Sequence, residues 1–76
     1  MAEYNYKGFV ADVYEDKLHV DVFTTFYEPP QFRVSLYSDF GRYESEPCLA
    51  DEMKVVRNIY LRYFEQSVDK HINRYK

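Results

Sequence analysis

The last third of the chain carries more apolar surface on one predicted helix than a small domain readily covers. Residues Ala50 to Tyr75 follow a helical period, with Pro47 just before them and Asp51 and Glu52 in the first turn. At about 100° per residue, the apolar side chains spread over an arc of about 220°, whereas a one-sided amphipathic helix needs about 100°. These side chains are Met53, Val56, Ile59, Tyr60, Leu61, Tyr63, Phe64, Val68 and Ile72. We therefore expect a second copy of the chain, another protein or a strongly curled sheet to cover part of the arc.

Alternating apolar residues predict strands in the first two thirds of the chain. From Leu18 to Phe26 the even positions are mostly apolar, and after two consecutive prolines the alternation resumes from Phe32 to Phe40. These two runs predict an antiparallel hairpin. The run from Tyr4 to Tyr14 changes parity at Gly8, which predicts a β-bulge or a bend at that glycine.

The predicted fold class is α+β, with a three-stranded antiparallel β-meander followed by one long C-terminal α-helix packed on one sheet face (β-β-β-α). We expect a single domain over residues 1–76, with a turn at residues 15–17 and a loop from Gly41 to Pro47. Phe32, Val34, Leu36 and Phe40 are predicted to point inward. A helix of about 26 residues is about 40 Å long, so its last turns, with His71, Ile72 and Tyr75, are expected to project beyond strands of about 33 Å.

The size of the chain favours support from oligomerisation. A domain of 76 residues buries only about 60% of the surface that its unfolded chain exposes. Because Cys48 is the single cysteine, an internal disulfide is excluded. Cys48 is interpreted as a small buried hydrophobic residue near the start of the helix. One thiol, and no apolar run at the N-terminus, predict a cytoplasmic location (host cytoplasm if the protein is phage-encoded), and no segment is apolar enough to span a membrane.

Charge is distributed unevenly along the chain. Residues 1–49 hold nine acidic and four basic residues, a difference of −5, whereas residues 50–76 hold four acidic and six basic residues, a difference of +2. One interpretation is ordinary solvated surface, with Lys70, Arg74 and Lys76 placed favourably at the negative end of the helix dipole. The other is electrostatic steering towards a basic partner that normally binds nucleic acid. Both interpretations remain open.

The outward face of the predicted hairpin is a candidate partner-binding surface, because one helix leaves one face of such a sheet uncovered. This face combines aromatic rings with charges of both signs, which is typical of protein interfaces. Its residues are His19, Asp21, Phe23, Tyr27, Arg33, Tyr37 and Asp39. The alternative interpretation is that Phe23 and Tyr37 merely pack on each other across the hairpin.

Catalytic and metal-binding residues are not predicted. His19 and Asp21 lie two residues apart on one strand, where they could form an ion pair or supply two metal ligands. A zinc site needs a third ligand, and His71 and Cys48 lie at opposite ends of the predicted helix. With two glycines in the whole chain, no phosphate-binding loop is present. We therefore expect no enzymatic activity and no cofactor.

Direct nucleic-acid binding is disfavoured by the charges. Exposed aromatic residues on a sheet can stack on bases, but the candidate face also carries Asp21 and Asp39. The basic residues of the helix are spread around its surface, whereas phosphate backbones require clustered cations. They are Lys54, Arg57, Arg62, Lys70 and Arg74.

Three hypotheses for function follow. The leading one is a small non-enzymatic protein–protein interaction module acting as a homodimer through its helix. The residues expected at the helix interface are Val56, Ile59, Tyr60, Leu61, Tyr63, Phe64, Val68 and Ile72. In size and composition, with no motif involved, the chain resembles inhibitors that phages and other mobile elements direct against host machinery. That resemblance implies an inhibitor of nuclease-based immunity such as CRISPR–Cas or restriction, in which acidic side chains could mimic phosphates. The acids concerned are Glu15, Asp16, Asp21, Glu28 and Asp39.

Two other functions are kept as alternatives. The first is a small nucleic-acid-binding or regulatory module that uses the exposed aromatic face of the sheet. The second is a structural or assembly subunit whose helix is covered only within a larger complex, because a wide apolar arc left in water is unfavourable.

Overall fold

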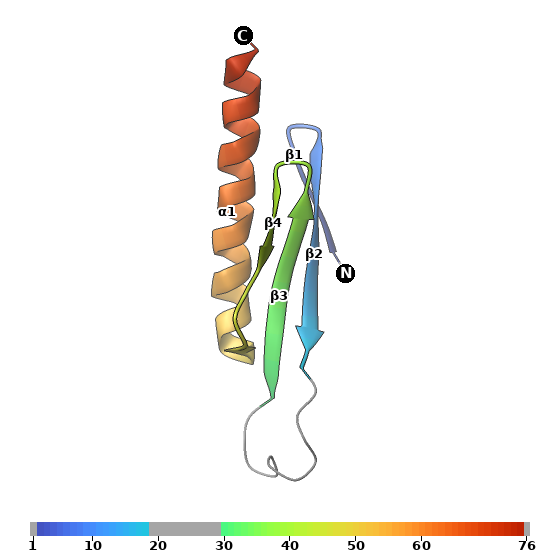
Figure 1. Cartoon of the computed structure of the whole chain (residues 1–76), viewed down its shortest axis with the longest axis vertical. Coiled ribbons are helices and arrows are strands. Elements are labelled where there is room, and N and C mark those ends of the chain that lie inside the picture. Colours follow the sequence, from blue (N-terminus) through green and yellow to red (C-terminus); the bar gives the residue numbers. More distant parts are fainter. Residues whose placement is uncertain (1, 19–29, 76) are drawn as a thin grey trace.

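The protein is an antiparallel sheet with one long helix against one of its faces (Figure 1). The computed structural model describes residues 2–18 and 30–75. Its elements in chain order are β1 (Ala2–Tyr6), β2 (Phe9–Lys17), β3 (Gln31–Ser38), β4 (Gly41–Glu44), β5 (Cys48–Leu49) and α1 (Ala50–Arg74). The strands lie in the order β1-β2-β3-β4, and β5 also pairs with β3. The predicted α+β class is confirmed, although the sheet has five strands within these described residues instead of the three predicted.

The first two strands form a hairpin at the position where the sequence predicts a bulge or bend. Tyr6 pairs with Phe9, and Lys7 and Gly8 between them have positive φ angles of 52° and 89°. This is the backbone of a two-residue primed turn, which glycine adopts without steric cost. The Asn5 side chain accepts a hydrogen bond from the Gly8 amide at 3.2 Å. The parity change at Gly8 therefore marks a reversal of the chain, and the prediction of one strand with a bulge or bend at that glycine is wrong.

The second strand continues through the residues predicted to form a turn. Asp16 pairs with Arg33 and Lys17 pairs with Phe32, so residues 15–17 belong to β2. Tyr37 in β3 has Asp12 of β2 on one side and Arg42 of β4 on the other. The predicted hairpin between the two middle runs is therefore wrong at this end of β3. Residues 19–26 of the earlier run lie outside the described residues.

The segment from Gly41, predicted as a loop, begins with a fourth strand. The hydroxyl of Ser38 accepts a hydrogen bond from the Phe40 amide and donates one to the Gly41 carbonyl, which shapes the β3–β4 turn. After β4, the Ser45 amide donates to the Val34 carbonyl at 2.9 Å, and the Ser45 hydroxyl accepts from the Val34 amide at 2.9 Å. These bonds continue the pairing past the end of β4, so only the few residues before β5 form a loop.

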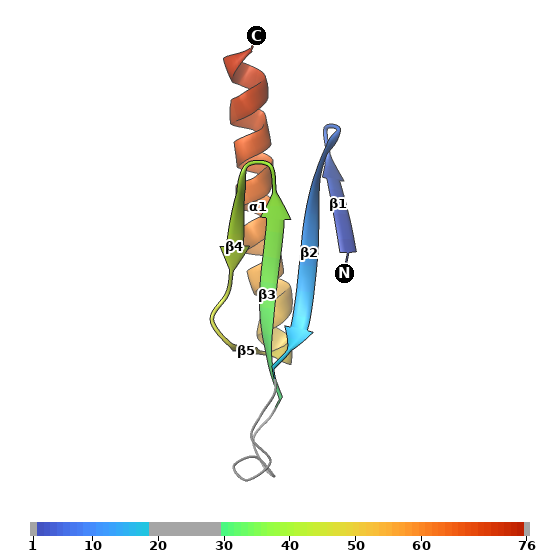
Figure 2. The ribbon, with the colours of Figure 1, turned by 45° about the vertical axis from the view of Figure 1, so that its right-hand side comes forward.

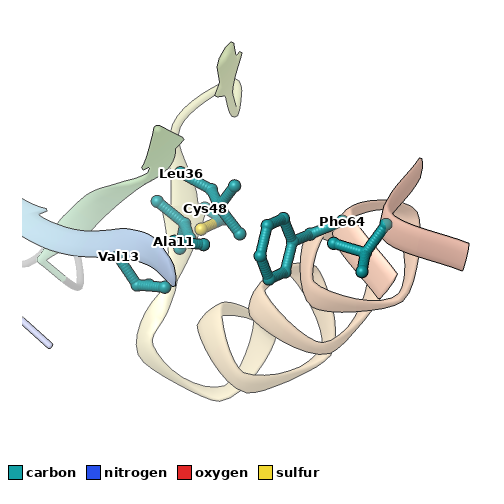
Figure 3. Close-up of a cluster of buried hydrophobic side chains, with 7 residues drawn as sticks. Ala11, Val13, Leu36, Cys48 and Phe64 are labelled. Carbon is teal, nitrogen blue, oxygen red and sulfur yellow. The ribbon is translucent and has the colours of Figure 1, made fainter. Parts of the chain in front are cut away.

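The core lies between the sheet and α1 (Figures 2 and 3). Val34 and Leu36 are fully buried, as predicted, and Phe32 and Phe40 are half-buried. Cys48 is also buried, which confirms its interpretation as a small hydrophobic residue. The buried residues are Ala11, Val13, Val34, Leu36, Cys48, Phe64 and Val68. Because a domain of this size buries so few large side chains, each of them contributes a large share of its stability.

The helix begins and ends within one residue of the prediction. The Glu52 carboxylate accepts a hydrogen bond from the Leu49 amide at 3.1 Å, which satisfies one backbone donor at the helix start. At the other end the last turn projects past the hairpin turns (Figure 2). His71 still packs against Phe9 and Phe40, with ring centroids 5.5 Å and 5.3 Å away. Ile72 is half-buried against the core, so of the three residues predicted to project only Tyr75 is largely exposed.

Candidate functional site

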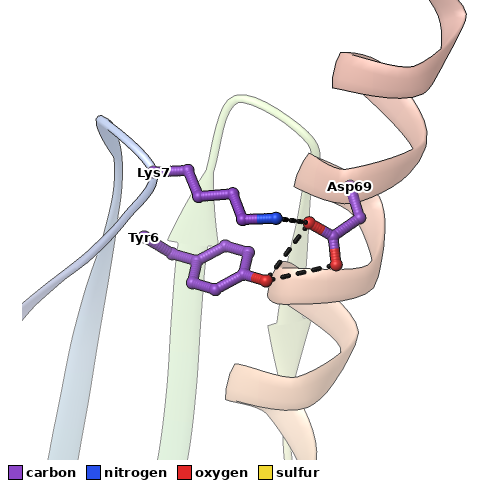
Figure 4. Close-up of polar contacts among 3 residues, drawn as sticks. All are labelled: Tyr6, Lys7 and Asp69. Atoms are coloured by element: carbon purple, nitrogen blue, oxygen red, sulfur yellow. Dashed lines mark hydrogen bonds and ion pairs between the residues drawn. The ribbon is translucent and has the colours of Figure 1, made fainter.

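A group of polar contacts joins β1 and its turn to the helix (Figure 4). The Lys7 ammonium donates to Asp69 Oδ1 at 2.8 Å, and the Tyr6 hydroxyl lies 3.2 Å from both oxygens of the same carboxylate. The Tyr4 hydroxyl donates to Glu65 at 2.5 Å. The hydrogen bond from Lys7 lowers the pKa of Asp69 and raises the pKa of Lys7, and the bond to Glu65 raises the pKa of Tyr4. In these contacts the polar side chains of the first hairpin bind carboxylates of α1. We therefore assign them a structural role, which is to hold the hairpin against the helix.

Residues suited to metal binding or nucleophilic catalysis are not grouped in the described part of the chain. Within residues 2–18 and 30–75, no three His, Cys, Asp or Glu side chains lie close enough together to hold a metal ion. Cys48 is buried in β5, two residues before α1 begins, and its thiol donates to the Phe32 carbonyl at 3.4 Å. His71 is in the last turn of the same helix. His19 and Asp21, the pair weighed as metal ligands from the sequence, lie outside the described residues.

The sheet face turned away from α1, here called the open face, carries a cluster of aromatic and charged side chains. The rings of Tyr14 and Tyr37 meet edge to face with centroids 5.4 Å apart. The guanidinium of Arg42 lies 5.3 Å from the Tyr37 ring centroid and 3.6 Å from Glu44. The Tyr37 hydroxyl donates to Glu44 at 3.1 Å. Three strands therefore bring these four residues, the open-face cluster, into contact with one another on the surface.

The predicted sheet-face residues are only partly brought together. Arg33 and Tyr37 lie on the open face of β3, and Asp39 is exposed in the β3–β4 turn. The other four predicted residues, His19, Asp21, Phe23 and Tyr27, lie outside the described residues. Within the described residues Tyr37 packs against Tyr14, and Phe23, the partner suggested by the sequence, lies outside them.

Three members of the open-face cluster were missed by sequence reasoning. The sequence pattern places Tyr14 in an irregular strand that runs into a turn, and it places Arg42 and Glu44 in a loop. The alternation of polar Arg42 and Glu44 with the aromatic Tyr43 is a strand signal, but three residues are too few to distinguish a strand from a loop. In the sheet, Tyr43 pairs with Leu36 and packs on the helix side.

A shallow hollow of about 520 Å³ lies beside the open-face cluster. It is at the end of the sheet that carries the β1–β2 and β3–β4 turns. Two carboxylates, those of Asp12 and Asp39, line it together with the ring of Tyr37. The remaining lining residues are Gly8, Phe9, Val10 and Ser38. Carboxylates beside an aromatic face suit a cationic side chain, because both groups attract positive charge.

The helix arc divides into a covered part and an exposed margin. Phe64 and Val68 are buried, and Leu61 and Ile72 pack half-buried against the core, as do Met53, Val56 and Tyr60. On the opposite margin, Ile59 is 43% exposed and Tyr63 45% exposed. Val55, which was not among the predicted interface residues, is 60% exposed. We call Val55, Ile59 and Tyr63 the helix stripe.

An aromatic residue of the sheet extends the helix stripe beyond the helix. The ring of Tyr43 in β4 lies 5.7 Å from that of Tyr63 and stacks on that of Tyr60 at 5.4 Å. Burial raises the pKa of the Tyr60 hydroxyl. The exposed apolar surface therefore runs from the outer margin of α1 towards the edge strand β4.

Comparisons of the chain with protein-family models, curated proteins and solved structures return no significant match. Within the described residues, the helix is not apolar enough over a sufficient length to cross a membrane.

Proposed function

We propose that this protein is a small non-enzymatic interaction module, an inhibitor of phage or mobile-element type that occupies a surface of a host macromolecular machine and acts as a homodimer. The observation that carries the proposal is the open-face cluster beside the acidic hollow, on the sheet face that α1 leaves uncovered. Aromatic and arginine side chains are enriched among residues that dominate binding energy, and charged groups commonly surround them.

The arrangement of the open-face cluster supports a binding role because its side chains already contact one another. Tyr37 contacts Tyr14 with its ring edge, Arg42 with its ring face and Glu44 with its hydroxyl. Ordering a free side chain at an interface costs about 0.5–1.5 kcal/mol, so a prearranged cluster binds with a smaller entropic loss. Mutual packing alone would explain the contacts, but it does not account for the adjoining hollow.

The charges favour a basic partner surface over nucleic acid. Asp12 and Asp39 line the hollow, and Glu44 lies in the cluster itself, so phosphate groups would be repelled where the aromatic rings are available. A partner that binds nucleic acid elsewhere in its cycle offers the complementary basic surface. Among the acids proposed as phosphate mimics, Glu15 instead pairs with Arg57 of the helix at 3.2 Å. Asp16 and Asp39 are exposed, and the other two lie outside the described residues.

The test is recovery of a partner from host extract, followed by measured affinities for point variants. Tyr37→Ala should weaken binding by about 2 kcal/mol, the scale of an interface hot spot, and should leave the fold intact. The matched control is Tyr75→Ala, because Tyr75 is 75% exposed at the far end of the helix. Equal affinities for the two variants would contradict the assignment of the open face as the contact surface.

A further inference from the structure

We propose that the outer margin of α1 is a self-complementary interface, on which a second copy of the chain packs its own α1 antiparallel about a two-fold axis. The inference rests on the proposed function in one respect, which is that the module acts as a homodimer. It adds the geometry of the contact and the residues that determine its direction.

Four exposed helix residues carry the inference: Glu52, Ile59, Tyr63 and Lys70. Successive members are seven, four and seven positions apart. At about 100° per residue, these spacings keep all four within about 40° around the helix axis. With a rise of 1.5 Å per residue, an acidic group therefore stands about 10 Å before the apolar pair and a basic group about 10 Å after it.

These four residues are spaced symmetrically along the helix, and the two outer ones carry opposite charges. Turning a second helix end for end, about a point level with Leu61, places Ile59 against Tyr63 of the second copy. The same operation places Glu52 against Lys70 of the second copy, and symmetry repeats both contacts. A parallel arrangement in register would instead place Glu52 against Glu52 and Lys70 against Lys70, which is repulsive. The charges of Glu52 and Lys70 therefore select the antiparallel arrangement.

The charged members are available for contacts between molecules. Among the described residues three ion pairs occur, and neither Glu52 nor Lys70 belongs to one. One oxygen of Glu52 accepts the hydrogen bond from the Leu49 amide. Since a carboxylate has two oxygens and about four acceptor positions, Glu52 can hold the start of its own helix and still accept from an ammonium group.

The apolar members gain from being covered. Ile59 and Tyr63 are nearly half exposed to solvent. Tyr43, on the edge strand of the sheet, packs beside Tyr63 and extends the apolar surface. Val55 lies one turn before Ile59 and widens the contact. Because only a few apolar side chains meet at the centre, we expect a dimer that dissociates on dilution, with a Kd in about the micromolar range.

The first experiment is sedimentation equilibrium of the full chain over about 1 μM to 1 mM, a range that brackets the expected Kd. The wild type should approach the mass of two chains, and Ile59→Glu should remain a monomer with an unchanged circular dichroism spectrum. Asn58→Asp is the control, because Asn58 is exposed on a different side of the same helix. A wild type that is monomeric throughout this range would overturn the inference.

The second experiment tests the antiparallel direction by charge exchange. Lys70→Glu should weaken the dimer about tenfold, because two attractive contacts become repulsive. The double variant Glu52→Lys with Lys70→Glu should regain most of that affinity, since the exchanged charges attract again. Thermal melts of each variant separate loss of the helix start from loss of the interface. A dimer that is indifferent to both changes would overturn the antiparallel arrangement.

These outcomes are distinguishable from failure of the proposed function. Tyr37→Ala lies on the opposite face of the molecule and should leave the dimer mass unchanged while weakening partner binding. If the wild type is monomeric but still binds its partner through the open face, the proposed dimer is wrong and the proposed interaction with a partner is retained.

Discussion

Lys7 and Asp69 lie 62 positions apart in the chain, yet their charged groups meet at 2.8 Å and join the tip of the first hairpin to the helix. The contact is possible because Lys7 occupies the turn between β1 and β2, where positive φ at Lys7 and Gly8 reverses the chain. The Tyr6 hydroxyl reaches the same carboxylate from the last position of β1. Local turn chemistry and the placement of the helix are therefore coupled through one side chain.

The coupling predicts an acid-dependent stability. The hydrogen bond from Lys7 lowers the pKa of Asp69 in the folded protein. The ionised carboxylate therefore stabilises the fold above the unfolded pKa of about 3.9, and this stabilisation is lost as pH falls through the folded pKa. Urea unfolding between about pH 2 and 7 should give the wild type a higher free energy of unfolding than Asp69→Asn at neutral pH, and this gap between the two proteins should close in acid. Because both groups are largely exposed, added salt should narrow the gap. A gap that persists at the lowest pH would contradict this origin.

The same pair predicts the opposite dependence in alkali. The pKa of Lys7 is raised chiefly by its hydrogen bond to Asp69. The charged ammonium group therefore contributes to the stability of the fold in full below the unfolded pKa of about 10.4. This contribution should be lost as pH rises through the higher folded value. Lys7→Met should abolish this part of the pH dependence. The Tyr4 hydroxyl, whose pKa is also raised, titrates in the same direction, so the measurement should be repeated in Tyr4→Phe.

The primed turn predicts a specific role for Gly8. Apart from the two adjacent residues of the chain, no atom lies within 4 Å of a Cβ atom placed at this position, so the cost of substitution is conformational and not steric. Gly8→Ala should reduce the free energy of unfolding by about 1–2 kcal/mol, because alanine disfavours positive φ. Gly8→Asn should cost less, since asparagine tolerates that region. Chemical denaturation of the three proteins measures the order, and equal stabilities would contradict the assigned turn.

The core predicts a much larger effect from one central side chain. Leu36 is fully buried where β3 faces the helix, and its truncation removes atoms that no neighbour can replace. Leu36→Ala should reduce the free energy of unfolding by about 2–5 kcal/mol, which is comparable with the whole stability of a small domain. Leu49→Ala is the control, since that leucine is 39% exposed. Far-ultraviolet circular dichroism with urea titration separates the two.

The helix and the centre of the core could be predicted from the sequence, because both follow from periodicity over many residues. The run from Ala50 is long and strongly periodic, and Val34 and Leu36 alternate with polar neighbours. The edge strands could not be read in the same way. Between β1 and β2 the only signal is one glycine, and β4 has four residues, too few for alternation to distinguish a strand from a loop.

Strand pairing also depended on information that the sequence pattern does not carry. Both middle runs had suitable alternation, but the partners of Tyr37 are set by register with β2 and β4. Pairing between distant segments is fixed by the sum of contacts across the sheet, so adjacent runs need not pair. For this reason the open-face cluster could be predicted only in part. Most of the apolar arc of the helix packs on the core, and the pattern did not indicate that Ile59 and Tyr63 would form the exposed margin.

The acidic hollow leads to a final prediction about the rate of partner binding. Asp39 is exposed in the β3–β4 turn at the rim of the hollow, so reversing its charge should change long-range attraction more than packing. Asp39→Lys should slow association with a basic partner about tenfold at low salt, and the difference should shrink at about 0.5 M salt, where charges are screened within a few ångströms. Glu46→Lys is the matched control, because Glu46 is exposed in the loop before β5, away from the hollow. If both reversals slow association equally, the acidity of the whole sheet half steers the partner, and the hollow has no special part in recognition.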